Sequence, residues 1–396
     1  MKVTFFSNFL NHHQLSFCLE MYKLLGEDFK FVATEPIPAE RINLGYSDMS
    51  NLYPFSLNTY TDNENKEEAV RLGNNSDVVI IGSAPTCFIK DRNKKNKLTF
   101  YYMERIFKKG KYRILNPKVF ISLLKNHTLN TNKNLYMLCA SAYTAADFNM
   151  VGAYKNKTFK WGYFPEVKEH FINELIYEKN KNEKMKLLWV GRFIKWKHPE
   201  QAIEIARMLK TAGYNFTLQL IGNGEMKISL NKLITQYGLS DYVEILGSMD
   251  PKRVREYMES SNIYLFTSDF NEGWGAVLNE AMNSGCAVVA SHAIGSVPFM
   301  LENNKNGLIY KNGDLKHFYQ CVTKLMDDPK LREVISVEAY KTVENSWNSK
   351  EAAKRILNLS QSIMQGKNTI FVEGPCSRAL IQPNRYVSYK NEISNK

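Results

Sequence analysis

Short apolar runs of strand-forming residues alternate with helical patterns along the first part of the chain. The runs are KVTFFS, FKFVAT, DVVIIGS and LYMLCAS, and the first is followed by a helical pattern at residues 14–25. Strands alternating with helices are typical of βαβ units, in which helices cover both faces of a parallel sheet. The first part of the chain is therefore predicted to form a parallel α/β domain.

The same alternation starts again at Met185 and predicts a second domain. Its strand-like runs are MKLLWVG, FTLQLIG, VEILG, NIYLFTS and CAVVAS, with helices expected at 199–212 and 229–237. We predict an α/β fold of two doubly wound, Rossmann-like domains that face each other across a deep cleft. The predicted boundaries are 1–165 and 166–350, with a helix and tail at 351–396. The helical pattern after Trp347 is expected to close the second domain.

Composition supports a folded, cytoplasmic protein. The chain has 396 residues, of which 44% are hydrophobic, enough for two cores. Its six cysteines occur singly, without the spacing of a zinc site or a disulfide framework. The N-terminus lacks the pattern of a signal peptide, and no apolar run approaches the roughly 18 residues of a membrane span.

The net charge of +12 is concentrated in one window. Residues 90–160 contain 16 Lys and Arg but only three acids, a surplus of 16 − 3 = 13; the acids are Asp91, Glu104 and Asp147. Such a surplus attracts polyanions, whether nucleic acid, anionic lipid head groups or a phosphorylated acceptor. A solvated basic surface without a partner is the alternative.

Glycines and cations gather at strand ends in the second domain. Gly191 ends the run MKLLWVG and is followed by Arg192, Lys195 and Lys197, while Gly222 and Gly224 follow the next strand. Cations in a strand-to-helix loop are suited to phosphate oxygens, which arginine grips in a bidentate way and lysine meets as a point charge. A solvated basic loop is the alternative interpretation.

The segment NEGWGAVLNEAMNSG, residues 271–285, places two carboxylates around a loop-to-helix junction. Glu272 precedes Gly273 and Gly275, and Glu280 lies inside the predicted helix. Eight residues of helix separate two side chains axially by up to about 12 Å, too far for a close acid and base pair. The carboxylates are therefore predicted to contact hydroxyls at opposite ends of one elongated ligand, with a diphosphate at the helix N-terminus. A nucleotide sugar has that form.

Three motifs give the second domain a family resemblance: Gly191-Arg192 with Lys197, the turn Gly222-x-Gly224, and the E-x7-E motif from Glu272 to Glu280. Together they resemble the C-terminal domain of retaining two-domain glycosyltransferases of group 1, or family 4, which have the GT-B fold. The resemblance implies that Arg192 and Lys197 bind the donor diphosphate, Glu280 the ribose, and Glu272 the transferred sugar near the reacting carbon. It also implies that the donor contacts Gly191, Gly222, Gly224, Gly273, Gly275, Ala276 and Val277.

The family resemblance further implies transfer with retained anomeric configuration, no metal and no cofactor beyond the nucleotide-diphosphate sugar. The leaving diphosphate is then expected to take the acceptor's proton. The sequence departs from the family in the turn Gly295–Phe299, which lacks the usual acid, and in the loop SNFLNHHQ, which lacks glycine. Candidate acceptor or cleft residues in the first domain are Asn11, His12, His13 and Glu104, for which helix capping or surface roles are the alternatives.

The expected activity is that of a hexosyltransferase-like enzyme acting on a hydroxyl of a glycan or lipid-linked acceptor. Cell-surface polysaccharide or glycolipid biosynthesis, such as that of capsule or lipopolysaccharide, is the expected process. Residues 90–160 are expected to hold the protein on the inner face of the plasma membrane.

Other classes of protein remain as alternatives. A sugar phosphorylase or nucleotide-sugar epimerase would use the same fold for different chemistry. A nicotinamide-dependent oxidoreductase is disfavoured because neither first strand is followed by GxGxxG. Nucleic acid is not expected as a partner, since no helix-turn-helix, zinc or RNA-binding signature accompanies the basic window.

Overall fold

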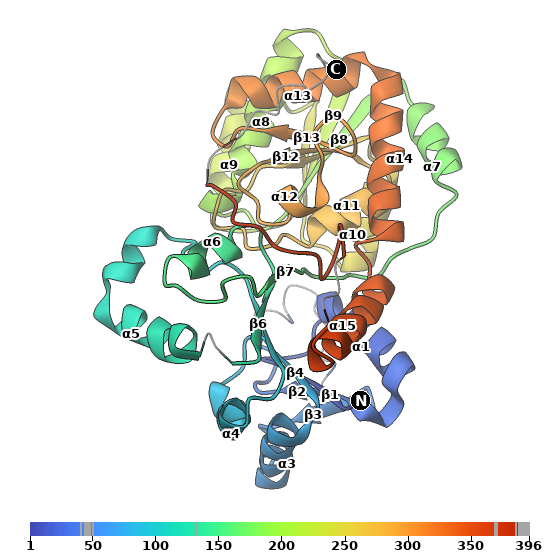
Figure 1. Ribbon diagram of the computed structural model, residues 1–396. Coiled ribbons are helices and arrows are strands. Elements are labelled where there is room, and N and C mark those ends of the chain that lie inside the picture. The colour runs from blue at the N-terminus through green and yellow to red at the C-terminus, as the bar shows by residue number, and fades with distance from the viewer. Residues whose placement is uncertain are drawn as a thin grey trace, which may run out of the picture. The chain divides into compact units, whose positions relative to one another are not determined.

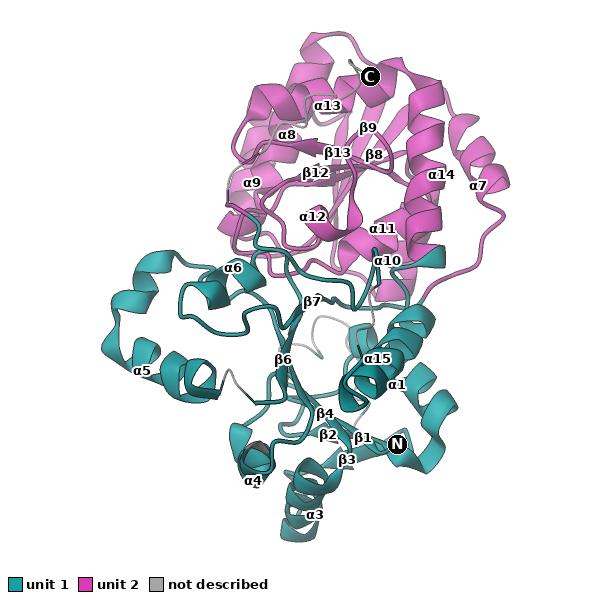
Figure 2. Ribbon diagram, viewed as in Figure 1, with its two compact units in different colours: residues 1–166, 345–382 teal, residues 167–344, 383–396 magenta. Residues whose placement is uncertain are grey.

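The computed structural model describes residues 1–39, 42, 49, 51–130, 133–367, 371–384 and 386. The chain divides into two compact units, shown in different colours in Figure 2. Unit 1 comprises residues 1–166 and 345–382, and unit 2 comprises 167–344 and 383–396. Each unit is described by itself, with the elements labelled in Figure 1.

Unit 1 is built on a seven-stranded sheet in the order β3-β2-β1-β4-β5-β6-β7, with every neighbouring pair parallel. Its strands are almost wholly buried, as parallel strands with covered faces require. The strands are β1 (Val3–Ser7), β2 (Phe29–Ala33), β3 (Ser56–Asn58), β4 (Val78–Ile81), β5 (Thr99–Met103), β6 (Leu135–Cys139) and β7 (Thr158–Lys160).

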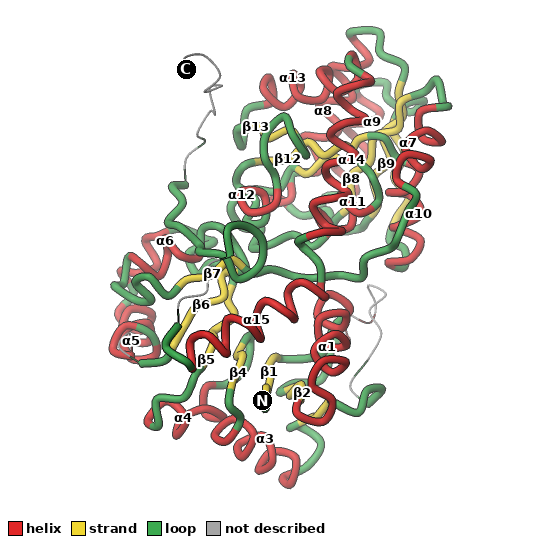
Figure 3. Tube along the Cα trace, turned by 45° about the vertical axis from the view of Figure 1, so that its right-hand side comes forward, coloured by secondary structure: helices red, strands yellow, loops and turns green. Residues whose placement is uncertain are grey.

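The helices of unit 1 include one from the far end of the chain. They are α1 (His12–Leu25), α3 (Asn63–Asn75), α4 (Lys90–Lys94), α5 (Pro117–Asn126), α6 (Thr144–Asn149) and α15 (Ser349–Met364), with short 3-10 turns η1 (Gly26–Asp28), η2 (Thr86–Ile89), η3 (Lys111–Leu115) and η4 (Thr128–Asn130). Helix α15 packs against α1, as Figure 3 shows.

The expectation that the helix after Trp347 closes the second domain was therefore wrong. Helix α15 buries Ala352, Ala353, Ile356 and Leu359 within unit 1. The hydrophobic pattern of an amphipathic helix defines the face that is buried, but it does not say which unit covers that face.

Unit 2 has a six-stranded sheet in the order β10-β9-β8-β11-β12-β13, also parallel throughout. The strands are β8 (Met185–Val190), β9 (Phe216–Ile221), β10 (Val243–Gly247), β11 (Ile263–Phe266), β12 (Ala287–Ser291) and β13 (Leu308–Tyr310). The helices are α7 (Ile172–Asn180), α8 (Pro199–Thr211), α9 (Lys227–Gln236), α10 (Pro251–Ser260), α11 (Val277–Asn283), α12 (Val297–Met300), α13 (Leu315–Asp327) and α14 (Pro329–Asn345), with the 3-10 turn η5 (Lys195–Lys197).

In both sheets the order of the strands, but not their direction, reverses beside the first strand. Strand β1 lies between β2 and β4, and β8 lies between β9 and β11. Unit 2 thus has the order 3-2-1-4-5-6 of a doubly wound sheet, and unit 1 has the same order with a seventh strand at its end. The prediction of two Rossmann-like domains is confirmed. In such sheets ligands bind beyond the carboxyl ends of the strands where the order reverses. A ligand site in unit 2 is therefore expected at the loops that follow β8 and β11.

No helix within the described residues combines the length and the apolar composition needed to cross a membrane.

Candidate functional site

An ion pair joins the two loops at the reversal point of the second sheet. The ammonium of Lys197, in η5 after β8, lies 2.5 Å from Oε2 of Glu272, in the loop after β11. Ser268 donates its hydroxyl to the same oxygen at 2.9 Å. The Lys197 and Glu272 side chains are only 13% and 11% exposed. At that burial each charge depends on its partner, because an uncompensated buried charge is costly.

Further hydrogen bonds fasten these two loops together. Thr267 donates its hydroxyl to the carbonyl of Lys197 at 2.6 Å and accepts the indole N–H of Trp189 at 2.8 Å. The backbone N–H of Asp269 donates to the carbonyl of Trp196 at 3.0 Å. The two loops are thus joined by these hydrogen bonds as well as by the ion pair.

His198 adds a charged link between the same loops. Its Nδ1 lies 2.8 Å from Oε1 of Glu200, and its Nε2 lies 3.4 Å from Oδ2 of Asp269. Hydrogen bonds to Asp269 and then Glu200 raise the pKa of His198 to about 9, so the ring is cationic at neutral pH. Burial opposes ionisation of Asp269, yet hydrogen bonds from His198 and Asn271 hold its pKa below the usual value. His198 adopts φ of +50°, a strained left-handed conformation for a residue other than glycine.

The glycines after β9 let two backbones meet. Phe193 donates its backbone N–H to the carbonyl of Asn223 at 2.8 Å. A Cβ on Gly222 would lie 1.8 Å from the carbonyl oxygen of Gly191, and a Cβ on Gly224 would lie 2.5 Å from that of Phe193. The need for these glycines is thus explained by the chain's own loop after β8, and their contact with a donor stays a prediction.

The loop that carries Glu272 leads directly into α11. Gly275, at φ of +83°, leaves no room for a side chain, since a Cβ there would lie 2.5 Å from the ring of Phe266. Trp274 is fully buried and donates its indole N–H to Asn279 at 3.0 Å. Helix α11 begins at Val277, immediately after Ala276, so the predicted junction from loop to helix is confirmed. The backbone N–H of Gly295 donates to the carbonyl of Glu272 at 3.3 Å.

Arg192 and Glu280 are two further ionisable side chains, one in the loop after β8 and the other in α11. Within the described part of the chain, neither the Arg192 guanidinium nor the Glu280 carboxylate forms a hydrogen bond or an ion pair. Burial raises the pKa of Glu280 to about 7, partly opposed by the cation of Arg255. A phosphate would satisfy Arg192, and ligand hydroxyls would satisfy Glu280.

The sequence motifs singled out four residues of this site, namely Arg192, Lys197, Glu272 and Glu280. They did not predict the ion pair of Lys197 with Glu272 or the residues that support it. Thr267, Ser268, Asp269 and His198 were not singled out. The available signal was their position: three polar residues directly follow the buried strand β11, and His198 directly follows Lys197. Residues at the carboxyl ends of parallel strands are the ones that a doubly wound sheet brings to its site.

The candidate residues of unit 1 already have structural roles. Asn11 caps α1: its side-chain oxygen accepts the backbone N–H of His13 at 3.0 Å. His12 and His13 form the first turn of α1, with ring centroids 3.8 Å apart. Glu104 pairs with Lys108 and accepts the hydroxyl of Tyr163 at 2.9 Å. The helix-capping alternative therefore accounts for Asn11, and an acceptor role for these residues stays a prediction.

Comparison with known families shows which family the region around this site matches. The family described as "Glycosyl transferases group 1" matches residues 172–342, from the start of α7 into α14, which include every site loop of unit 2. This region belongs to the group 1 glycosyl transferases.

Relatives of this glycosyl transferase region are distant in sequence. An uncharacterized glycosyltransferase of Methanocaldococcus jannaschii is 24% identical over 70% of this chain and 67% of its own length. The capsular polysaccharide biosynthesis glycosyltransferase CapM of Staphylococcus aureus is 27% identical over 44% of this chain and 45% of its own. This chain thus spans less than half of CapM's length.

A solved structure extends the likeness to the whole fold. The Anabaena protein Alr3699/HepE, crystallised in complex with UDP, matches with a TM-score of 0.65 at 16% identity, over 92% of this chain and 99% of that one. At that identity the match shows the fold alone, and this chain has the two-domain GT-B fold.

Proposed function

We propose that this chain transfers a sugar from a nucleotide-diphosphate sugar to a hydroxyl group of an acceptor, with retention of anomeric configuration and without a metal. The observation that carries the proposal is the buried Lys197–Glu272 pair at the reversal point of the second sheet, flanked by the unpartnered Arg192 and Glu280. Membership of residues 172–342 in the group 1 glycosyl transferases supports the assignment.

In the proposed reaction the bond between the anomeric carbon and the diphosphate oxygen breaks while the acceptor oxygen bonds to that carbon. The acceptor's proton passes to the departing diphosphate, on the same face of the sugar. Arg192 and Lys197 stabilise the negative charge that grows on the leaving group, a form of catalysis that prearranged charges supply without a separate base. Glu272 holds Lys197 in place and faces the sugar.

Glu280 is proposed to accept the ribose hydroxyls of the donor. An ionised carboxylate offers only acceptors and so matches two hydroxyl donors, whereas the protonated form does not. Because the pKa of Glu280 is about 7 before a ligand binds, the ionised fraction grows between pH 6 and pH 8.

The acceptor is proposed to be a glycan or a lipid-linked glycan used to build a cell-surface polysaccharide or glycolipid. CapM, whose name refers to capsular polysaccharide biosynthesis, supports this process. An anionic membrane surface is the proposed partner of residues 90–160. A location on the inner face of the plasma membrane stays a prediction.

The test is nucleotide-sugar binding as a function of pH. Thermal shifts with UDP-, GDP-, ADP-, CMP- and dTDP-sugars first identify the donor. With that donor, wild-type affinity should rise between pH 6 and pH 8, while that of Glu280→Gln should be weaker and flat. Equal pH dependence in both proteins contradicts the role of Glu280. The exposed Glu333 on α14, changed to Gln, serves as the matched control.

The stability of the unliganded protein as a function of pH gives a second readout, and the direction of its change follows from the raised pKa of Glu280. The folded pKa of Glu280 lies above its usual value, so the folded state holds the proton more tightly and loses stability as pH rises from about 4.5 to about 7. Glu280→Gln should remove that loss. Product analysis by NMR then tests retention, and activity in excess EDTA tests independence from metal. A product of inverted configuration, or turnover without an acceptor hydroxyl, contradicts the proposal and favours the alternative chemistry.

A further inference from the structure

Many cations of the basic window 90–160 serve the fold of unit 1. Arg92 is buried and donates to the carbonyl oxygens of Ser76, Asp77 and Leu98. Arg105 forms an ion pair with Asp147 at 3.2 Å, with both side chains almost fully buried. Lys108 pairs with Glu104. Similar protein partners hold Lys94, Lys97, Lys157 and Lys160. The window is therefore not a uniform attractive surface.

The exposed cations concentrate instead around α5, together with exposed apolar side chains. We call residues 109–129, from the residue before Gly110 to η4, the α5 edge. Its exposed cations are Lys109, Lys111, Arg113, Lys118 and Lys125. Its exposed apolar side chains, 40% to 80% exposed, are Tyr112, Leu115, Phe120, Ile121 and Leu129. In the sequence no acid occurs between Glu104 and Asp147.

This gathering of apolar side chains is not the ordinary scatter of a surface. Of the 20 large hydrophobic side chains exposed within the described residues, five lie between Tyr112 and Leu129, a stretch of 18 residues. Scattered exposed apolar residues need no explanation, but a contiguous group with a charged rim marks an interaction surface. Figures 1 and 3 both show α5 at the outer edge of unit 1.

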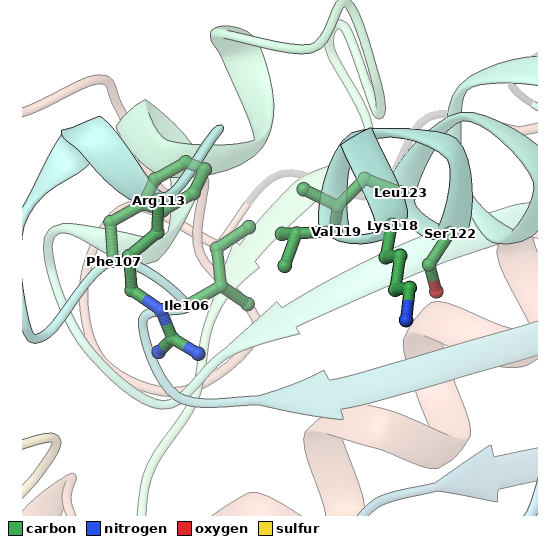
Figure 4. A pocket seen from close by; sticks show the side chains of 7 residues that line it. All are labelled: Ile106, Phe107, Arg113, Lys118, Val119, Ser122 and Leu123. Atoms are coloured by element: carbon green, nitrogen blue, oxygen red, sulfur yellow. The ribbon is translucent and has the colours of Figure 1, made fainter. Parts of the chain in front are cut away.

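Helix α5 has apolar residues on two sides. Val119 and Leu123, one helical turn apart, line a hollow of about 370 Å³, and Phe120 and Ile121 follow on the side that is left exposed. Figure 4 shows the hollow, with Arg113 on one side and Lys118 and Ser122 on the other. Ile106 and Val119 lie between the cations. A lipid phosphate set between two cations, with its chains beside apolar walls, fits this arrangement.

We propose that the α5 edge is the surface by which this protein docks on an anionic lipid bilayer. Tyr112, Leu115, Phe120, Ile121 and Leu129 enter the interfacial layer, and the surrounding cations contact head-group phosphates. Nucleic acid fits less well, because the aliphatic Leu115, Ile121 and Leu129 neither stack on bases nor bind phosphate. The inference rests on the proposed function in one respect: a lipid-linked acceptor gives the enzyme a reason to dock on a membrane. The docking surface itself is inferred from its exposed cations and apolar side chains.

The experiment measures flotation of the full chain with vesicles of phosphatidylcholine alone or mixed with phosphatidylglycerol. Wild type should bind the mixed vesicles only, and less as salt is raised. Arg113→Glu with Lys118→Glu should weaken binding by roughly fivefold or more for each cation lost. Phe120→Ser with Ile121→Ser should weaken it by about tenfold or more.

Matched controls lie elsewhere on unit 1. Lys23→Glu with Lys66→Glu makes the same change of charge at exposed positions on α1 and α3. Leu24 and Val70 are 45% and 39% exposed, close to the 40% and 49% of Phe120 and Ile121, so Leu24→Ser with Val70→Ser matches the apolar change. Binding that is unchanged in the α5 variants, or lost equally in the controls, overturns the proposal.

Two further readouts keep the outcomes distinct. If the charge variant loses vesicle binding, the Phe120 and Ile121 variant keeps it, and wild type binds an RNA oligonucleotide equally well, the surface is a general polyanion site and the proposal fails. Nucleotide-sugar thermal shifts should be the same in every variant, which also shows that each folds. If wild type binds vesicles but no nucleotide sugar, the proposed function fails while the docking surface stands.

Discussion

The two units share the same strand order at β1 and β8, but different kinds of side chain occupy the loops at the points where that order reverses. Beside β1, the loop is closed by a network of neutral groups: Gln14 donates to the hydroxyl of Ser7 at 3.2 Å, Ser7 to Asn8 at 3.2 Å, and Asn11 to Gln14 at 3.2 Å. Beside β8, the loops are joined by charges, in the Lys197–Glu272 and His198–Asp269 pairs.

This difference shows where the chemistry of a doubly wound domain resides. The same strand order places loops together in both units, yet within the described residues only the loops of unit 2 bring buried opposite charges, and an arginine without a hydrogen bond or ion pair, to the reversal point. Topology supplies the place, and the side chains supply the function. Changes at the two reversal points should therefore have different consequences.

The largest difference is expected in turnover. Glu272→Gln and Lys197→Met should each lower kcat by about 10² to 10³, the usual effect of removing one preorganised charge from a reacting centre. Because each change also leaves the other charge unpaired, the double variant should lose less than the sum of the two. The measurement is a double-mutant cycle on kcat with the donor identified by thermal shift.

The matched change in unit 1 is Gln14→Ala, which removes a buried amide from the neutral network. It should leave kcat within a few fold of wild type while lowering stability. Additive effects of the Lys197 and Glu272 variants contradict a functional pair, and a large fall in kcat for Gln14→Ala removes the contrast between the units.

The next difference is expected in stability when a glycine near each reversal point becomes alanine. Gly222→Ala would set a Cβ 1.8 Å from the Gly191 carbonyl oxygen at φ of +145°, and backbone strain with overpacking should cost about 2 to 5 kcal/mol. Gly82, after β4, has 3.5 Å of space to its nearest neighbours, so Gly82→Ala should cost less than about 1 kcal/mol. Urea unfolding measures both, and equal losses contradict the close approach of the two loops.

Whether a structural feature could be predicted from the sequence depends on how far apart along the chain the residues that form it lie. The strand runs MKLLWVG and NIYLFTS and the restart at Met185 predicted two doubly wound domains, because alternation is a local pattern. The partner of α15 was not predictable in this way, since α1 lies more than 300 residues away in the chain.

The same rule applies to the candidate site: residues within short motifs could be predicted, whereas contacts between distant residues could not. Short motifs singled out Arg192, Lys197, Glu272 and Glu280 as site residues, and Glu280 lies in a helix as expected. The Lys197–Glu272 ion pair crosses 75 residues, and the His198–Asp269 pair crosses 71. No local spacing encodes such pairs, so the supporting role of Asp269, Ser268 and His198 appears only once β8 and β11 are placed side by side.

The smallest expected difference is in pH dependence, and His198 tests it. Its folded pKa of about 9 exceeds its usual 6.5, so the stabilisation is complete below about pH 6.5 and is lost as pH rises through 9. With the ring 27% exposed, solvent screening reduces the expected contribution to about 1 to 2 kcal/mol. His198→Gln keeps a side chain at the same φ, so backbone strain cancels. Its deficit in urea unfolding should be full at pH 6 and nearly absent at pH 10.

The control in unit 1 is Asn11→Ala, which removes the cap of α1 and should cost about 1 kcal/mol. That cost should be flat from pH 6 to pH 10, because an amide carries no titrating charge, and nucleotide-sugar binding should not change. A His198→Gln deficit that is equally flat means that the ring acts only by packing. In that case Lys197 and Glu272 form the remaining charge pair at the second reversal point among the described residues, and the contrast in charge pairing between the units narrows to that ion pair.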